Sequence, residues 1–169
     1  MSVIDALTGL YNRDGFLLLA EQALRNARRS GFPVCALLID VDGLKRVNDD
    51  QGEDAGDALI ADLARAIKAT FRESDITGRV GGDEFCVLAV NANIDVEALR
   101  QRFAQALKDF SNPQRPYQLS ASVGAAVWED TETLDALLAR AHEAMSFEKN
   151  AKKGLNPARS SRAAPSQTM

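Results

Sequence analysis

The most constraining feature of the sequence is a short, uninterrupted apolar run from Val34 to Ile39, which begins after a proline and ends at Asp40. This length and this lack of alternation are typical of a strand that is covered on both faces. A chain of 169 residues is long enough to form one domain with a proper core around such a strand. We therefore expect a single sheet with helices packed against it.

The rest of the chain predicts which elements surround this strand. Apolar residues at helical spacing predict helices over 16–30, about 59–71, about 96–110 and 134–149. Apolar or alternating runs predict further strands over 76–80, 85–90 and 117–128, with Gly81 and Gly82 as a tight hairpin turn. The predicted fold class is α/β, an α+β sandwich. Its core is a ferredoxin-like βαββαβ unit with an extra N-terminal helix.

Composition excludes some functions and leaves others open. A net charge of −4 argues against a nucleic-acid binder that relies on bulk basic charge, but not against a small polyphosphate ligand. There is no apolar segment of membrane length and no signal peptide, so we expect a cytoplasmic location and no membrane contact by this segment. Cys35 and Cys86 lie in apolar runs, which predicts buried, reduced thiols.

The ends of the chain carry two further expectations. Residues 157–169 are rich in Ser, Ala, Arg and Pro, which predicts a disordered tail after a domain over 1–156. The abrupt start at Met1 leaves room for an input domain in a longer parent chain.

Acidic side chains follow two of the predicted strands. Asp40 and Asp42 come at the end of the buried strand, and Asp83 and Glu84 come directly after the hairpin glycines. If the hairpin lies beside the buried strand, three or four carboxylates converge at one edge of the sheet. Such oxygens suit Mg²⁺ that is shared with substrate phosphates. The alternative is a pair of solvated turns, because Asp and Gly are ordinary turn residues.

A second polar element follows the buried strand. In Asp42-Gly43-Leu44-Lys45 a glycine loop leads into a short helical turn, which can direct backbone N–H groups at phosphate oxygens, and Lys45 adds a mobile positive charge. Many turns contain Gly and Lys, so this pattern alone has little specificity.

Taken together, these pieces resemble the GGDEF family from Asp5 to about Asn156. The segments that carry the resemblance are Asp5 to Arg13, Asp40 to Asp49, Gly52, Gly56-Asp57, Arg72 to Asp75, Arg79 to Phe85 and Ser122 to Gly124. The resemblance implies a nucleotide-cyclase-like fold and a diguanylate cyclase. In this activity two such domains form a transient homodimer, each holding one GTP, and condense the two nucleotides into cyclic di-GMP with release of pyrophosphate.

The resemblance also implies roles for individual residues. Asp40, Asp83 and the Val41 carbonyl would bind Mg²⁺, with Mn²⁺ as a substitute. Glu84 would assist activation of the 3′-hydroxyl. Lys45 would act with Asp83 and Glu84 as the third member of the catalytic set.

For the substrate, the resemblance implies phosphate contacts from Gly43, Leu44 and Lys45. Asn48 and Asp57 would bind the guanine edge. At the C-terminal end, Lys149 and Lys153 would form a phosphate-binding pair; the alternative is a solvated basic helix end.

Arg72 and Asp75 would form an inhibitory site for the product, and a weak surface ion pair is the alternative. The chain departs from the family pattern at Tyr11, Leu44, Glu53, His142 and Ser146. His142 is interpreted as a substituted helix residue rather than a catalytic base.

Three functions remain in view. The first is an active cyclase, which as a lone domain we expect to be mainly monomeric with concentration-dependent activity. The second is a catalytically weak or inactive module that binds GTP or cyclic di-GMP as a regulator, which the altered final helix favours. The third, a plain interaction domain, leaves the polar residues unexplained.

Overall fold

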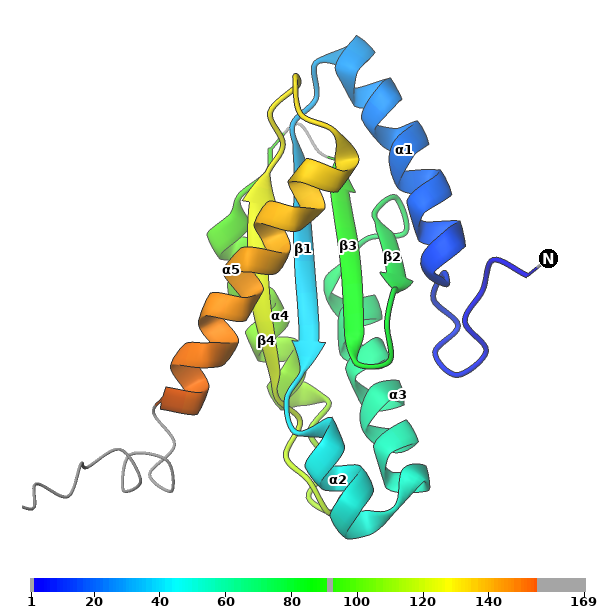
Figure 1. Ribbon diagram of the computed structural model, residues 1–169, viewed down its shortest axis with the longest axis vertical. Helices are drawn as coiled ribbons and strands as arrows, with labels where there is room; N and C mark the ends of the chain where they lie inside the picture. Colours follow the sequence, from blue (N-terminus) through cyan, green and yellow to red (C-terminus); the bar gives the residue numbers. More distant parts are fainter. Residues whose placement is uncertain (1, 91–92, 155–169) are drawn as a thin grey trace, which may run out of the picture.

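The computed structural model describes residues 2–90 and 93–154, so the predicted tail over 157–169 lies outside the described residues. Its elements are α1 (Arg13–Ser30), β1 (Val34–Val41), α2 (Leu44–Gln51), α3 (Glu53–Thr70), β2 (Ile76–Arg79), β3 (Glu84–Val90), α4 (Val96–Asp109), β4 (Ala121–Val127) and α5 (Leu134–Gly154). The strands form one sheet in the order β2-β3-β1-β4, and each neighbouring pair is antiparallel. The predicted βαββαβ core and its extra N-terminal helix are confirmed (Figure 1).

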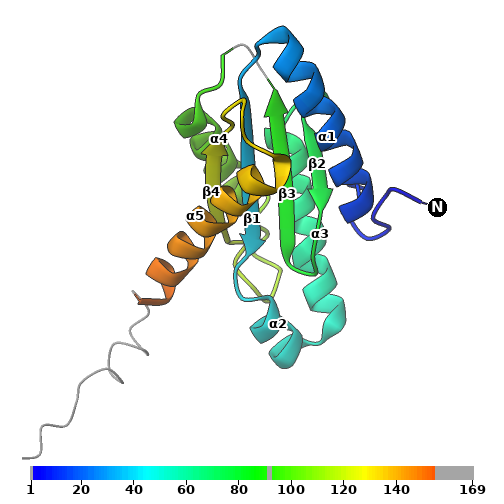
Figure 2. The same ribbon diagram turned by 45° about the horizontal axis from the view of Figure 1, so that its top comes forward.

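Strand β1 lies at the centre of the sheet and is buried along its whole length. Its odd-numbered residues from Cys35 to Ile39 join a core formed with α3 and α4. Its even-numbered residues from Val34 to Leu38 join a second core, formed with α1 and α5. The two views show α1 and α5 on one face of the sheet and α3 and α4 on the other (Figures 1 and 2). The apolar run therefore has the two-sided burial that its composition predicts.

Two helices are longer than predicted, because α3 begins at Glu53 rather than near residue 59 and α5 runs on to Gly154. Two further differences lie closer to the end of β1. The polar stretch after β1 contains a full helix, α2, whose only buried residue is Val47. A helix that is polar on nearly all sides has no apolar periodicity to reveal it. The strand predicted from Tyr117 begins only at Ala121. Before it, Arg115 and Tyr117 make side-chain contacts to α3.

Those contacts centre on Asp62 of α3, which is 1% exposed. Its carboxylate accepts a hydrogen bond of 2.6 Å from the Tyr117 hydroxyl and one of 3.1 Å from Arg115 Nε, and it pairs with Arg65. A buried carboxylate needs such partners. The cluster therefore holds the segment that leads into β4 against α3.

Both cysteines are free and buried, as predicted. Cys35 belongs to the core with α3 and α4, whereas Cys86 belongs to the core with α1 and α5, so the sheet separates them. Burial raises the pKa of the Cys35 thiol to about 11, which keeps it protonated. Across residues 2–90 and 93–154, no helix has the length and apolar character needed to cross a membrane.

Candidate functional site

The predicted convergence of carboxylates occurs at the end of β1. The pairing of β1 with β3 sets Asp40 opposite Glu84, and the Val41 N–H donates to the Asp83 carbonyl at 3.0 Å. Carboxylate oxygens of Asp40, Asp83 and Glu84 all lie within 4.8 Å of one another. Three of the four predicted acids therefore form one cluster at this edge of the sheet.

Asp40 is the most buried member of this cluster, with 7% of its surface exposed. Its Oδ1 atom lies 2.9 Å from the Lys149 ammonium, which is its charged partner. Burial raises the pKa of Asp40 to about 6; the Lys149 ammonium opposes this rise and the Asp83 charge adds to it. A buried carboxylate beside two further carboxylates offers the oxygen ligands that a hard divalent cation such as Mg²⁺ prefers.

This raised pKa predicts how stability depends on pH when no metal is bound. The pKa of Asp40 is about 6 in the folded chain, against 3.8 for an ordinary Asp. The folded state therefore binds this proton more tightly than the unfolded state does. The resulting stability is present below about pH 4 and is lost as the pH rises through about 6. One pKa unit corresponds to about 1.4 kcal/mol, so we expect Asp40 to lower the free energy of unfolding by about 2 kcal/mol between pH 4 and pH 7.

Urea unfolding in EDTA at pH 4.5, 5.5 and 7 checks this expectation. Asp40→Asn should gain stability relative to the parent chain as the pH rises. The matched control is Asp130→Asn, which removes an exposed carboxylate from the loop before α5 and should track the parent chain. If the difference in free energy of unfolding between the parent chain and Asp40→Asn stays constant across this pH range, the raised pKa of Asp40 is contradicted.

Asp42 does not join the acidic cluster but anchors the loop that follows β1. Its carboxylate accepts hydrogen bonds from Ser120 at 2.6 Å, Ser122 at 2.8 Å and Lys152 at 3.0 Å. Burial alone would raise the pKa of Asp42, but these hydrogen bonds hold it below its ordinary value. The carboxylate therefore stays charged and ties the end of β1 to β4 and α5.

Helix α5 brings two lysines, Lys149 and Lys152, to the end of β1. Lys149 contacts Asp40 and donates to the Val41 carbonyl at 3.2 Å. Its partner at the strand end is Lys152, which donates to Asp42 and to the Ala121 carbonyl. The predicted partner, Lys153, is exposed and makes no ion pair with any residue that the structure describes.

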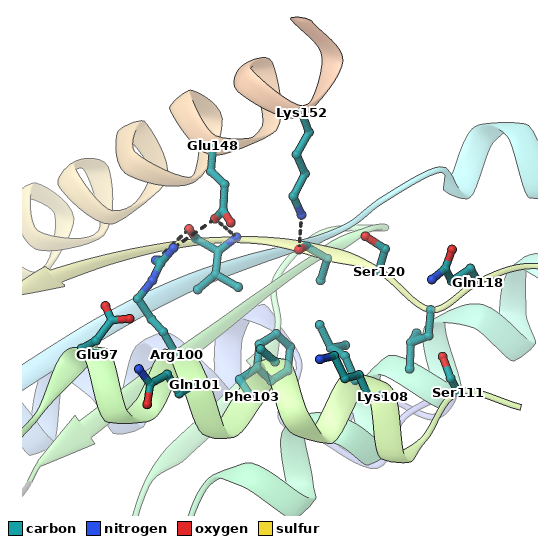
Figure 3. Close-up of a pocket in the computed structure, with 15 residues that line it drawn as sticks. Glu97, Arg100, Gln101, Phe103, Lys108, Ser111, Gln118, Ser120, Glu148 and Lys152 are labelled. Atoms are coloured by element: carbon teal, nitrogen blue, oxygen red, sulfur yellow. Dashed lines mark hydrogen bonds and ion pairs between the residues drawn. The ribbon is translucent and has the colours of Figure 1, made fainter. Parts of the chain in front are cut away.

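The position of α5 depends on close contact with β4. An added Cβ at Gly124 would lie 2.0 Å from Met145 N and 2.2 Å from Ala141 O, so only glycine lets the helix backbone approach this strand. One turn further along, Glu148 accepts a hydrogen bond of 2.6 Å from the Val123 N–H. Figure 3 shows Glu148 and Lys152 reaching from the helix to the strand edge. The segment from Ser122 to Gly124, which sequence comparison left without a role, therefore seats the helix that carries Lys149.

The predicted guanine and phosphate contacts lie on α2 and at the start of α3. Gly43 has a φ of 79°, which favours glycine, and α2 begins directly after it. Lys45 is exposed and Asn48 is half-buried. A Cβ at Gly56 would lie 1.7 Å from Asn48 Oδ1, so this glycine makes room for the Asn48 side chain. The exposed Asp57 comes next along α3.

The predicted inhibitory pair adopts a local turn. The Asp75 carboxylate accepts a hydrogen bond of 2.9 Å from the Arg72 backbone N–H, and the Asp75 N–H donates to the Arg72 carbonyl. Among the described residues the Arg72 side chain forms no ion pair and it is exposed, so the guanidinium is available to a ligand. A small cavity of about 90 Å³ beside the pair is also lined by Asp95 and Arg102.

Sequence reasoning missed two side-chain contacts at the site. His142 of α5 has its Nε2 atom 3.4 Å from Glu84 Oε1, although the sequence suggested only a substituted helix position. Arg79 donates to the Gly82 carbonyl at 2.8 Å and pairs with Asp5 at 3.4 Å, which ties the hairpin turn to the N-terminal segment. The quoted motifs contained Arg79 and Asp5, but nothing in their spacing indicated this pairing.

A groove of about 540 Å³ lies between α4 and the outer edge of β4. Arg100 and Glu148 form an ion pair of 3.5 Å within it, visible in Figure 3. The carboxylates of Asp40 and Asp83 do not line this groove. A nucleotide that binds the acidic cluster would therefore lie at the open end of the sheet rather than in this groove.

Comparisons with known proteins agree with this geometry. Residues 2–154 match the family model described as diguanylate cyclase, GGDEF domain. The chain is 39% identical over 131 residues to the probable diguanylate cyclase DgcJ of Escherichia coli K12. The matched region covers 77% of this chain and 26% of DgcJ. It is also 37% identical over 144 residues to the cyclic di-GMP phosphodiesterase NbdA of Pseudomonas aeruginosa. This matched region covers 83% of this chain and 18% of NbdA.

The chain thus spans about a fifth to a quarter of the length of these two relatives. Among solved structures, it is similar to a microbial GGDEF domain studied for a novel mode of interaction with cyclic di-GMP. That likeness has a TM-score of 0.75 at 29% identity and covers 88% of this chain and 91% of the other.

Proposed function

Because the chain belongs to the GGDEF domain family, which places it in cyclic di-GMP metabolism, we propose that it is a diguanylate cyclase. Two GTP molecules, each bound by one copy, would condense to cyclic di-GMP and two pyrophosphates. In each step a 3′-oxygen forms a bond to the α-phosphorus of the opposing nucleotide, the bond to pyrophosphate breaks, and the hydroxyl proton is lost. The observation that supports this proposal most strongly is the cluster of Asp40, Asp83 and Glu84 within 4.8 Å.

The carboxylates of Asp40 and Asp83 and the Val41 carbonyl would hold the divalent ion, Mg²⁺ or Mn²⁺. When bound, such an ion supplies positive charge to the triphosphate and favours ionisation of the attacking hydroxyl. Glu84 is half-buried at the edge of the cluster, where it would accept the proton from the 3′-hydroxyl.

The rest of the substrate would lie along α2, α3 and α5. The N–H groups at Gly43 and Leu44, together with Lys45, would contact phosphate oxygens at the start of α2. Asn48 and Asp57 would hydrogen-bond the guanine edge. Phosphate contacts from α5 would come from Lys149 and Lys153.

A second function is supported by the last helix and by one relative. Positions 142 and 146 hold His and Ser, where the family pattern has Asp and Tyr, and the matched NbdA is named a phosphodiesterase. The alternative proposal is a catalytically weak or inactive module that binds GTP or cyclic di-GMP and regulates a partner. In either case, Arg72 and Asp75 would bind cyclic di-GMP through the exposed guanidinium and the neighbouring carboxylate.

The test is direct conversion of GTP. The purified chain, freed of bound nucleotide, should form cyclic di-GMP in the presence of Mg²⁺, as measured by chromatography, and EDTA should stop it. Activity per chain should rise with protein concentration, because the reaction needs two copies. Binding of GTP without any product would contradict the cyclase proposal and support the regulatory one.

A further inference from the structure

The amine of Lys149 contacts the two atoms of β1 that are proposed to bind the metal. Its Nζ lies 2.9 Å from Asp40 Oδ1 and 3.2 Å from the Val41 carbonyl oxygen. The ammonium is therefore the charged partner of this buried carboxylate. One lysine cation is thus shared between a carboxylate and a carbonyl that would otherwise face a divalent ion.

From this contact we propose that Lys149 is a built-in substitute for the metal cation, which must leave Asp40 and Val41 before a divalent ion can bind. The inference rests on the proposed function, because it takes the metal ligands from there. It assigns Lys149 two successive positions, on the strand when the site is empty of nucleotide and on a phosphate when a triphosphate is bound.

The backbone of Lys149 cannot make this exchange by moving away. Helix α5 is held against β4 by the close approach at Gly124 and by the hydrogen bond from the Val123 N–H to Glu148. The Lys152 contact to Asp42 adds a third tie one turn later. The amine of Lys149 must therefore move from Asp40 to a nearby anion by rotation of its own side chain, which has four flexible methylene groups.

Electrostatics makes the exchange depend on the nucleotide. An ammonium and a divalent cation on the same oxygens repel strongly, because like charges at contact distance are poorly screened in a partly buried site. A triphosphate gives the displaced ammonium a new anionic partner. Metal and nucleotide should therefore bind with strong positive coupling, while metal alone binds weakly.

The experiment measures Mn²⁺ binding without nucleotide, from the loss of the free-ion electron paramagnetic resonance signal, at pH 8 so that Asp40 is ionised. Lys149→Met should bind Mn²⁺ about tenfold more tightly than the parent chain or better, which corresponds to about 1.4 kcal/mol. Lys149→Arg keeps the charge and should show no such gain. The matched control, Lys153→Met, removes the same charge from the same helix without touching Asp40.

A second measurement adds a non-hydrolysable GTP analogue. In the parent chain the analogue should strengthen Mn²⁺ binding by a larger factor than in Lys149→Met. If Lys149→Met does not fold, as judged by its thermal unfolding, Lys149→Gln replaces it. Equal Mn²⁺ affinity in the parent chain and the Lys149 variant, an equal gain in Lys153→Met, or no Mn²⁺ binding in any variant would overturn the inference.

These outcomes are separable from the fate of the proposed function. If the parent chain makes cyclic di-GMP but Lys149→Met binds Mn²⁺ no more tightly than the parent chain, only the proposed role of Lys149 as a metal substitute is overturned. A chain that makes no product while Lys149→Met gains Mn²⁺ affinity overturns the cyclase and leaves the inference standing.

Discussion

An Asp83→Asn variant should form cyclic di-GMP about 1000-fold more slowly than the parent chain and yet remain fully folded. Asp83 shares the edge cluster with Asp40 and Glu84, within 4.8 Å, and is proposed to bind the metal. A neutral amide oxygen is a poorer ligand for a hard cation than a carboxylate. A loss of about 4 kcal/mol in transition-state stabilisation corresponds to this rate change.

The fold should survive this substitution because residue 83 contacts β1 through its backbone rather than its side chain. Its carbonyl accepts the hydrogen bond from the Val41 N–H, and asparagine keeps that carbonyl. The substitution also removes a negative charge that raises the pKa of Asp40. We therefore expect the metal-free variant to unfold at the same temperature as the parent chain or slightly higher.

Chromatography on one preparation measures the rate of cyclic di-GMP formation. Thermal unfolding of the same preparation checks that the fold is retained. Asp130→Asn is the matched control, since it removes one exposed carboxylate at the far end of β4 and should keep the parent rate. An Asp83→Asn variant with more than a tenth of the parent rate would remove Asp83 from the metal site.

The acidic cluster could be predicted from the sequence because it depends on local order. The apolar run of β1 ends at Asp40, and the glycine hairpin begins β3 at Glu84. Once the two strands pair, their antiparallel register sets Asp40 opposite Glu84. Once the hairpin is placed beside β1, no long-range packing detail is needed for that result.

What could not be predicted depends on contacts between distant segments. Lys152 contacts Asp42, just after β1, because the rotation of α5 is set by its close contact with Gly124, which lies 28 residues before Lys152. The segment that leads into β4 is held by Asp62, which lies 55 residues before Tyr117. Periodicity within a helix reports its apolar side but not its rotation against a neighbouring strand.

The second large effect should follow from Gly124→Ala. The added Cβ would lie 2.0 Å from Met145 N and 2.2 Å from Ala141 O, both of them backbone atoms of α5. Non-bonded heavy atoms rest about 3.5 Å apart, so the helix must move away from β4 by more than about 1 Å. Overpacking of this kind should destabilise the chain by about 2–3 kcal/mol.

The same movement should lower the rate of cyclic di-GMP formation about 100-fold, because a misplacement of about 1 Å in a catalytic group has this effect. The movement of α5 displaces Lys149 from the end of β1. Asp40, Asp83 and Glu84 keep their places, because they lie in or next to β1 and β3 rather than on α5. Mn²⁺ binding without nucleotide should therefore persist or strengthen in Gly124→Ala, although catalysis is lost. Rates are compared at a temperature where urea unfolding shows both proteins to be folded.

Gly154→Ala is the control for this substitution, because the same methyl group added at the end of α5 meets no atom within 4 Å. It should leave both stability and rate unchanged. A Gly124→Ala protein with parent stability and parent rate would mean that α5 adapts without moving Lys149. A protein that loses stability but keeps its rate would mean that the seat of α5 supports the fold and not the chemistry. The expected loss of both, with metal binding retained, requires that the glycine places Lys149 for the triphosphate.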